Sequence, residues 1–439
     1  MKKCYTYFLT TSLFLLFSPL VLAQYTSIPD AEFEQLLITE SIDSEGILDG
    51  QVLSSDVATV TSLDISYTSI SDITGIQDFT SLISFEASTQ HYLTNLDFSG
   101  LQTLETINLW LSTNIMALNV TGCTNLKDLD ISYTRIAALD LSTNTLLESM
   151  YFEKNMHLLH LDVSGKTNLN TLYGRQSAVL TLDISGCSAL SFININETSV
   201  QSLDLSGNTA ITTLVFYRTD LNTLNLSNCS NLNTLVFDWS YGLTHLNLTN
   251  CSSVTDIRFL NGAFFNFDLN TDDLVNLETI EFTYGGVTSL DLRNNNNLTT
   301  AIFSDSNIAN LDLRNGNNTN LDLTIYYTNL NCISVDDIDY ATNNWPDVVD
   351  DVVYSTDCST LTLNEIQTES LKLYPNPSSE FLQISGLQQN VNYSILDFQG
   401  KQMQSGTLIP QENITINSLQ SGLYFLRIDS GTNFKFIKK

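Results

Sequence analysis

Two histidines, His157 and His160, offer the most obvious combination for chemistry, because Asp162 follows them in the segment NMHLLHLD. Imidazole and carboxylate groups bind metal ions and carry protons. On a strand, however, residues three apart point to opposite faces, so the two rings could share a metal ion only if the chain bent between them. We therefore expect surface or ladder roles for both histidines and no metal site.

Other sequence signatures of catalysis are missing. The sequence contains no glycine-rich phosphate loop, no Gly-x-Ser-x-Gly nucleophile elbow and no cysteine placed beside a histidine for attack. Asp43, Glu45 and Gly46 imitate part of a calcium loop, but with Gly46 as the sixth position the twelfth is Val52, where a bidentate Glu is required. We interpret this segment as a turn, and we predict a protein that is not an enzyme and has no catalytic metal or cofactor.

A column of carboxylate and amide residues recurs about once every 21 to 23 residues. Its members are followed mostly by Ser or Thr, and they are Asp97, Asn119, Asp140, Asp162, Asp183, Asp204, Asn225, Asn247, Asp268, Asp291 and Asp312. Carboxylates stacked one strand apart repel one another, and bound calcium ions bridging neighbouring members would relieve that repulsion. The alternative, which we favour, is that each Asp accepts hydrogen bonds from nearby Ser, Thr or turn amides.

A second set of residues varies from repeat to repeat, as a recognition surface must. It collects aromatic side chains and most of the scarce basic ones, and aromatic and Arg anchors are typical of interface centres. The alternative is that these aromatic residues only cover strand edges and supply β propensity. We predict binding through Trp110, Tyr133, Tyr151, Tyr173, Arg175, Tyr217, Arg218, Asp238, Trp239 and Arg258.

The elements that must position both sets are short strands. From Leu126 to Thr145 the pattern LxxLxLxx(N/C/T) occurs twice, and these two half-repeats make one repeat unit. Twelve repeat units begin at residues from Val60 to Leu298. Alternate residues of a strand share a face, so Leu129 and Ile131 point inward while Asp130 faces solvent. Because one unit has almost no core of its own, the units are stable only when stacked and capped. The period predicts a solenoid with a short strand on each of two faces.

The units resemble bacterial leucine-rich repeats, including those of internalin-like surface proteins, whose pattern LxxLxLxxNxL is met by Val60, Leu63, Ile65, Thr68 and Ile70, with Thr in place of Asn. In that family the first strand set lines the binding surface. We therefore expect a mainly β protein made of a parallel β-solenoid. Its predicted parts are a helical cap at 24–59, the repeats at 60–331, a second cap at 332–358, a linker at 359–368 and a β-sandwich at 369–439.

The cysteines fall into two groups. Cys123, Cys187, Cys229 and Cys251 replace the asparagine that ends a half-repeat, and we expect them to be buried thiols, although Cys229 and Cys251 are close enough for a bridge between adjacent rungs. Cys332 and Cys358 bracket the second cap. In an oxidising compartment they are expected to form a disulfide over a buried Trp345, and this segment resembles the closing region of exported Bacteroidetes leucine-rich repeat proteins.

Both ends of the chain indicate export. Residues 1–23 have Lys2 and Lys3 ahead of a short apolar run that ends at Ala23, which is the pattern of a secretory signal peptide. Its removal would change the formal net charge from −31 to −33, because two lysines and no acids leave. That charge disfavours nucleic acid and anionic lipid as partners. No later stretch is long and apolar enough to be an integral membrane segment.

The last seventy residues alternate strand-like segments with Pro, Asn and Gly turns. They resemble the C-terminal sorting domain of type IX secretion cargo through three short motifs in order: Leu373 with Tyr374, Pro375, Asn376 and Pro377, then Asp397 to Lys401, then Gly422, Leu423 and Tyr424. The resemblance implies that the type IX machinery is a partner, and that the protein is secreted or displayed on the outer cell surface.

The leading prediction for function is an exported, non-enzymatic solenoid that binds a protein or a glycan through its variable strand face. A structural spacer of the envelope or matrix without a specific ligand is the alternative. A third interpretation is an enzyme whose chemistry lies in the N-terminal cap.

Overall fold

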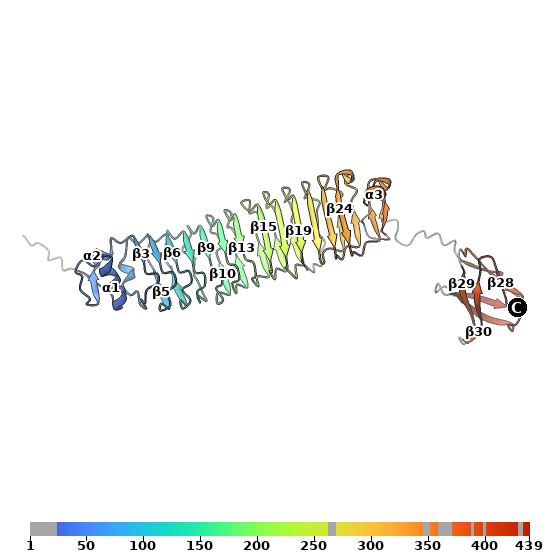
Figure 1. Cartoon of the computed structure of the whole chain (residues 1–439), viewed down its shortest axis with the longest axis horizontal. Helices are drawn as coiled ribbons and strands as arrows, with labels where there is room; N and C mark the ends of the chain where they lie inside the picture. Colours follow the sequence, from blue (N-terminus) through green and yellow to red (C-terminus); the bar gives the residue numbers. More distant parts are fainter. Residues whose placement is uncertain are drawn as a thin grey trace, which may run out of the picture. The chain divides into compact units, whose positions relative to one another are not determined.

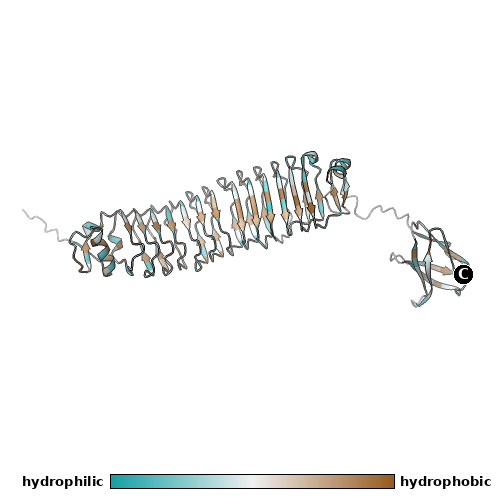
Figure 2. Ribbon diagram, in the orientation of Figure 1, coloured by the Kyte–Doolittle hydropathy of each residue, from teal (hydrophilic) through white to brown (hydrophobic). Residues whose placement is uncertain are grey.

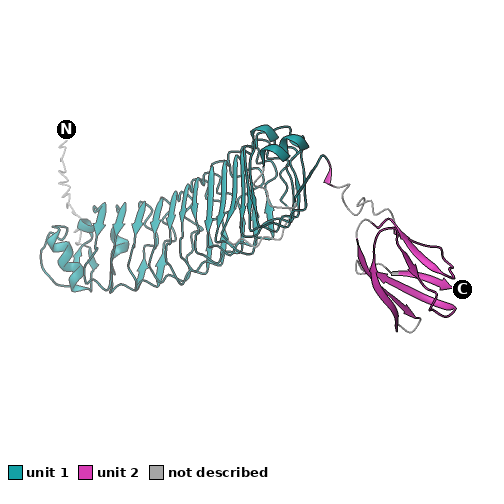
Figure 3. Ribbon diagram, turned by 45° about the vertical axis from the view of Figure 1, so that its right-hand side comes forward, with its two compact units in different colours: residues 1–356 teal, residues 357–439 magenta. Residues whose placement is uncertain are grey.

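The computed structural model describes residues 24–261, 269–345, 352–358, 371–387, 390–397, 401–428 and 433–439. The chain divides into two units, residues 1–356 and 357–439 (Figure 3). The predicted signal peptide at 1–23 and the predicted linker at 359–368 lie outside the described residues.

The first unit is a solenoid of parallel strands standing side by side (Figure 1). We call its first face the seven-stranded sheet from β3 to β13 together with the six-stranded sheet from β15 to β24, thirteen strands in all. The count is one more than the twelve repeats predicted, because β24 adds a final rung. The strands are β3 (Ser62–Asp64), β4 (Ser84–Glu86), β6 (Thr106–Asn108), β8 (Asp128–Asp130), β9 (Ser149–Tyr151), β11 (Thr171–Tyr173), β13 (Phe192–Asn194), β15 (Thr213–Tyr217), β17 (Thr234–Asp238), β19 (Asp256–Leu260), β20 (Thr279–Thr283), β22 (Thr300–Ser304) and β24 (Asp322–Tyr326).

The second face carries shorter groups of paired strands, which confirms the prediction of strands on both faces. Residues 136–141 form no strand, so the sheet is interrupted beside Asp140. The groups are β5 (Asn95–Asp97) with β7 (Ala117–Asn119); β10 (His160–Asp162) with β12 (Thr181–Asp183); β14 (Ser202–Asp204) with β16 (Thr223–Asn225) and β18 (His245–Asn247); and β21 (Ser289–Asp291) with β23 (Asn310–Asp312), β25 (Cys332–Ser334) and β26 (Val353–Ser355).

The solenoid core is built from columns of identical positions, and its strands are coloured mainly as hydrophobic in Figure 2. From β15 onward the second inward position is always Phe or Ile, and five phenylalanine rings form a buried stack with centroids 5.0 to 5.9 Å apart: Phe216, Phe237, Phe259, Phe282 and Phe303. Burying each ring contributes roughly 1.5 to 3 kcal/mol. The spacing follows from the strand separation, which sets aromatic rings at stacking distance.

Polar ladders satisfy the backbone at the turns. The amide of Asn144 donates to the carbonyl oxygens of Val120 and Cys123, at 3.1 and 2.8 Å. Cys123 donates from Sγ to the Phe98 oxygen at 3.1 Å, so cysteine does replace asparagine as a ladder donor. All four ladder cysteines are buried and unbridged, as predicted. Burial raises the pKa of the Cys123 thiol to about 11 and that of Cys229 to about 12, which keeps these thiols protonated and unreactive.

The N-terminal cap contains the predicted helix, α1 (Ala31–Thr39), whose first backbone N–H groups are capped by Asp30 Oδ1. Buried Phe33 and Leu37 close the end of the core. Two strands, β1 (Tyr25–Ser27) and β2 (Gln51–Leu53), pair beside it and are followed by α2 (Ser54–Val57) and η1 (Ile76–Asp78). Asp43 Oδ1 accepts the Glu45 N–H at 2.9 Å, which is the hydrogen bond of a turn.

The C-terminal cap contains η2 (Asn318–Asn320) and α3 (Ile338–Asn344). Trp345 is buried and donates from its indole nitrogen to the Leu321 oxygen at 3.2 Å, as expected for a residue that closes the core. Cys332 and Cys358 are disulfide-bonded, which confirms the pairing predicted from the sequence.

The described strands of the second unit form two antiparallel sheets. One antiparallel sheet consists of β27 (Lys372–Tyr374), β28 (Phe381–Ser385) and β31 (Asn413–Thr415). The other consists of β30 (Gln402–Leu408), β29 (Val391–Asp397), β32 (Gly422–Ile428) and β33 (Asn433–Lys438). The buried side chains of both sheets form one cluster that includes Leu382, Ile395, Leu426 and Phe436, so this unit has a core of its own.

Candidate binding face

The ten residues predicted for binding all lie on the first face or in the turn that follows its strands, and none of them is buried. Five are strand residues, namely Tyr151, Tyr173, Tyr217, Asp238 and Arg258. The other five lie in the turns, namely Trp110, Tyr133, Arg175, Arg218 and Trp239. The parallel pairing places equivalent residues on neighbouring strands, as with Tyr151 opposite Tyr173.

An aromatic row crosses three neighbouring strands. The rings of Tyr151 and Tyr173 have centroids 6.4 Å apart, and Tyr173 stacks on Phe192 at 6.3 Å with only 5° between the planes. Phe192 was not among the residues predicted from the sequence. It occupies the first outward position of its strand, and in the other coils that position is Ser, Thr or Asp. Phe192 is 48% exposed, so the row leaves apolar ring surface accessible to solvent.

Arg175 is held in place by an ion pair. Its Nη2 lies 2.7 Å from Glu197 Oε1, and Gln176 donates to the other carboxylate oxygen at 2.9 Å. The hydrogen bonds from Gln176 and Arg175 lower the pKa of Glu197, so this carboxylate stays ionised beside the guanidinium. The fixed geometry reduces the side-chain entropy that Arg175 would lose on binding a partner.

Arg218 lies over two aromatic rings. Its guanidinium carbon is 5.2 Å from the Tyr217 ring centroid and 5.9 Å from that of Trp239, which is cation–π geometry. Asp238 beside them accepts a hydrogen bond from the Asn261 amide at 2.8 Å. The group therefore forms a preformed patch of aromatic, cationic and polar atoms.

A similar group lies nearer the N-terminal end of the face. Trp110 and Tyr133 meet edge to face with centroids 6.1 Å apart, and the Lys154 ammonium lies 5.1 Å from the Tyr133 centroid. Arg258, at the other end, is bound to Asp256 of its own strand at 2.8 Å. The ten predicted residues thus belong to separate clusters along the face rather than to one pocket.

The turn after each strand of the first face passes through the left-handed region, and a residue other than glycine occupies that position in all thirteen coils. We call this set the corner column: its φ angles run from 49° to 61°, and its members are Tyr67, Thr89, Leu111, Tyr133, Lys154, Gln176, Glu197, Arg218, Trp239, Asn261, Tyr284, Asp305 and Tyr327. Such a conformation costs a non-glycine residue about 1 kcal/mol or more.

On the second face, the comparable turn is made by residues that adopt positive φ at a lower energetic cost. Positive φ there belongs to Gly100, Gly122, Gly165, Gly186, Gly207 and Gly316, and to Asn228 and Asn250. Glycine adopts this conformation freely and asparagine tolerates it. The contrast shows that the fold does not require large side chains at such corners. The sequence analysis did not recognise the corner column. Aligning the two half-repeats position by position could have found it, because glycine recurs at this corner in one half and not in the other.

The column of carboxylates and amides on the second face caps its own turns. Ten of the predicted members accept the backbone N–H of the residue two positions on, at 2.8 to 3.2 Å: Asp97, Asn119, Asp140, Asp162, Asp183, Asp204, Asn225, Asn247, Asp291 and Asp312. The hydroxyl and N–H of Ser142 lower the pKa of Asp140, and Ser164 acts in the same way on Asp162. Asp268 lies outside the described residues.

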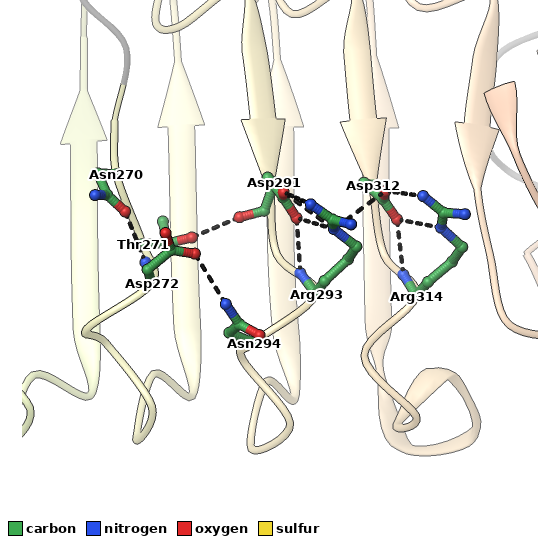
Figure 4. Close-up of polar contacts among 8 residues, drawn as sticks. All are labelled: Asn270, Thr271, Asp272, Asp291, Arg293, Asn294, Asp312 and Arg314. Atoms are coloured by element: carbon green, nitrogen blue, oxygen red, sulfur yellow. Dashed lines mark hydrogen bonds and ion pairs between the residues drawn. The ribbon is translucent and has the colours of Figure 1, made fainter. Parts of the chain in front are cut away.

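Two coils near the C-terminal end neutralise this column with arginine (Figure 4). Arg293 contacts Asp291 at 2.6 Å and Asp312 at 3.7 Å, and Arg314 contacts Asp312 at 2.5 Å. In the part of the chain that the structure describes, no three His, Cys, Asp or Glu side chains converge as a metal cluster. His157 lies in a bend before β10, whereas His160 is the first residue of that strand, and the two residues line different cavities.

The sorting motifs are structural in the C-terminal unit. Asn376 bridges to β33, because its Oδ1 accepts from Ile437 and its Nδ2 donates to the Lys435 oxygen. Its neighbours Tyr374, Pro375 and Pro377 surround this bridge in sequence. Gly422 begins β32, where the Tyr424 ring is buried 5.6 Å from that of Phe436. Asp397 accepts the Lys401 N–H at 2.9 Å, while residues 398–400 are outside the described chain.

Comparison with solved structures finds bacterial leucine-rich repeat proteins. The functional domain of InlJ from Listeria monocytogenes, described as including a cysteine ladder, is 18% identical with a TM-score of 0.38, over 95% of this chain and 99% of that one. A leucine-rich repeat protein from Leptospira interrogans is 14% identical with a TM-score of 0.32, over 70% and 94%. One from Bacteroides ovatus is 14% identical with a TM-score of 0.20, over 64% and 88%.

No curated protein matches the chain. Among the described residues, no helix has the length and apolarity that a membrane span requires. The family model of the secretion system C-terminal sorting domain matches residues 372–439. These residues therefore carry the sorting signal of type IX secretion, which directs this leucine-rich β-solenoid to the cell surface or the extracellular space.

Proposed function

We propose that the exported solenoid binds a protein or glycan partner through the first face, and that it does so without catalysis. The single observation that carries the proposal is the corner column: thirteen residues other than glycine at positive φ, on the face whose outward residues vary. Strain that a fold does not need is a reason to look for function at the strained residues. The three clusters around Tyr133, Tyr173 and Arg218 supply aromatic and cationic anchors at those coils.

The uniform second face supports this assignment by contrast. Its carboxylate and amide residues hydrogen-bond to their own turns, and glycine occupies most of its corners at positive φ. Its side chains are therefore explained by folding. On the first face Asp64, Asn108, Asp130 and Asn194 cap their turns in the same way, but an exposed aromatic ring cannot accept such a hydrogen bond. An interaction surface accounts for the difference between two faces built from the same half-repeat.

The experiment is a pull-down with the full chain from host, algal or cell-surface extracts, joined to a glycan array. Tyr173→Ala combined with Arg175→Ala removes the middle cluster and is expected to weaken capture while the thermal melting temperature stays within a few degrees of the parent chain. The matched control is Met116→Ala with Leu159→Ala, two exposed apolar residues outside the first face. Equal capture by both double variants contradicts the proposal. If the parent chain enriches no protein or glycan in either assay, the result favours the alternative of a structural spacer.

A further inference from the structure

We propose that a shallow cavity beside the corner column binds an acidic peptide segment by taking one of its apolar side chains between two cations. The inference rests on the proposed function and adds to it a subsite and the chemistry of the partner. The cavity has a volume of about 490 Å³, and its lining includes Tyr133, Arg135, Lys154, Met156, His157 and Gln176.

The charge of the lining is unusual for this molecule. The chain has 48 acidic residues against 17 Lys and Arg, yet the cavity is lined by Arg135 and Lys154 and by no carboxylate. Three other cavities in the described part of the chain all include Asp204. Gln176 of the lining donates to Glu197 at 2.9 Å, but that carboxylate is paired with Arg175 at 2.7 Å. Since charges separated by more than about 8 Å are largely screened at physiological salt, the two cations of the lining favour an anionic partner at the cavity.

Both cations lack an ion pair among the described residues. The ion pairs found there involve Lys127, Arg175, Arg258, Arg293 and Arg314 instead. Lys154 contacts the Tyr133 ring, and both Lys154 and Arg135 are exposed. A carboxylate from a partner can therefore approach either cation without first displacing a carboxylate of the chain.

The remaining lining suits an apolar side chain. Met156 is 62% exposed and lines the same cavity as Tyr133, and methionine adapts its shape to irregular apolar groups. Tyr133, Lys154 and Gln176 belong to the corner column, so stacked coils hold their backbones in place. A sugar would need many polar partners for its hydroxyl groups, because a buried hydroxyl without a hydrogen bond is costly. An apolar side chain flanked by carboxylates matches both the cations and the apolar lining.

The test uses the purified full chain and a fluorescein-labelled peptide in which Glu alternates with Leu and Phe. Three further peptides replace Glu by Gln, replace Leu and Phe by Ser, or replace Glu by Lys. We expect fluorescence anisotropy to show binding of the acidic apolar peptide, at least about tenfold tighter than any of the other three. Binding should weaken as salt is raised, because the contacts are exposed charges.

The decisive variant is Arg135→Gln with Lys154→Gln, which should lower the affinity about tenfold or more. Met156→Ser should lower it as well while leaving the salt dependence in place. The charge-matched control is Lys127→Gln with Arg293→Gln, two paired cations outside the cavity, and it should bind like the parent chain. Thermal melts confirm that each variant is folded.

Equal loss in the control and the cavity variant would overturn the inference, because it would indicate attraction to net charge alone. Equal binding of the peptide in which Gln replaces Glu would also overturn it. The same holds if an acidic oligosaccharide, an oligouronate, binds and the acidic apolar peptide does not. If extracts yield a partner that depends on Tyr173 and Arg175 while the peptide does not bind, the cavity inference fails and the proposed function stands. If peptide binding depends on Arg135 and Lys154 but capture from extracts does not depend on Tyr173, the proposed function of the wider first face fails and the cavity inference stands.

Discussion

The ring of Phe152 fills the space that a side chain at position 174 would need, because a Cβ built on Gly174 would lie 2.0 Å from Phe152 Cε2. Both residues occupy the second inward position of neighbouring coils, where the other coils have aliphatic or aromatic side chains. Gly174 is therefore a packing requirement of one particular rung. It explains how a glycine can stand in a core column without leaving a hole.

Replacing Gly174 by Ala should destabilise the solenoid by about 1 to 3 kcal/mol, since the added methyl group overpacks a buried site. Chemical denaturation followed by circular dichroism measures the change. Adding Phe152→Leu to Gly174→Ala should recover part of the loss, because the smaller side chain makes room for the methyl group. A double variant that is as unstable as the sum of the two single variants would contradict this contact.

The disulfide between Cys332 and Cys358 should stabilise the C-terminal cap. Its removal by Cys332→Ser with Cys358→Ser is expected to lower the free energy of unfolding by about 3 kcal/mol, because the bridge closes a loop of intermediate length in the unfolded chain. Calorimetry with and without dithiothreitol gives the measurement. The parent chain should melt lower in the reductant and the double serine variant should not change, since the four ladder cysteines carry no bridge.

The sequence predicts much of the fold because the period repeats many times. Spacing alone predicts strands on both faces, inward Leu129 and Ile131, and cysteine in place of ladder asparagine, and the structure confirms each of these. It does not reveal the thirteenth strand, β24, because Leu321 starts that coil after an irregular segment rich in asparagine. A periodic pattern identifies regular rungs well and terminal rungs poorly.

The candidate site was predicted in part. Strand alternation placed Tyr173 and Arg175 on the exposed face, but it could not show that Glu197 binds Arg175 or that Phe192 stacks on Tyr173. Those contacts depend on side-chain directions between coils, which spacing does not contain. Lys154 was missed because its importance comes from a left-handed backbone and from the ring of Tyr133, neither of which is visible in a pattern of residue types.

Acid should weaken the second face near its C-terminal end. The hydrogen bonds of Arg293 lower the pKa of Asp291 below its ordinary value of 3.8, so this carboxylate stabilises the fold above that value and loses its effect as the pH falls through the lowered pKa. Asp291→Asn should cost about 0.5 kcal/mol at pH 7, a small value because the pair is half exposed, and less at pH 2. Urea denaturation at both pH values measures it, and an equal cost at both would contradict the role of the ion pair.

Calcium should leave the stability of the solenoid unchanged. The carboxylates from Asp140 to Asp204 already accept backbone hydrogen bonds, which gives each of them a folding role without a cation. Thermal melts in EDTA and in millimolar calcium are expected to coincide. A melting temperature that rises with calcium, and that no longer does so after Asp183→Asn with Asp204→Asn, would instead establish a cation ladder. Asparagine is the right substitution because Asn225 and Asn247 cap the same turn.

The corner column predicts an unusual response to substitution at Tyr327, which is 81% exposed at φ 49°. Tyr327→Gly should keep the free energy of unfolding within about 1 kcal/mol of the parent chain, because relief of strain offsets the greater freedom of glycine in the unfolded state. Tyr327→Val should lower it by at least about 1 kcal/mol, since a β-branched residue is strongly disfavoured there. Denaturation of the two variants side by side tests this. If valine is tolerated as well as glycine, the corner is not strained, and the main support for a binding role of the first face is lost.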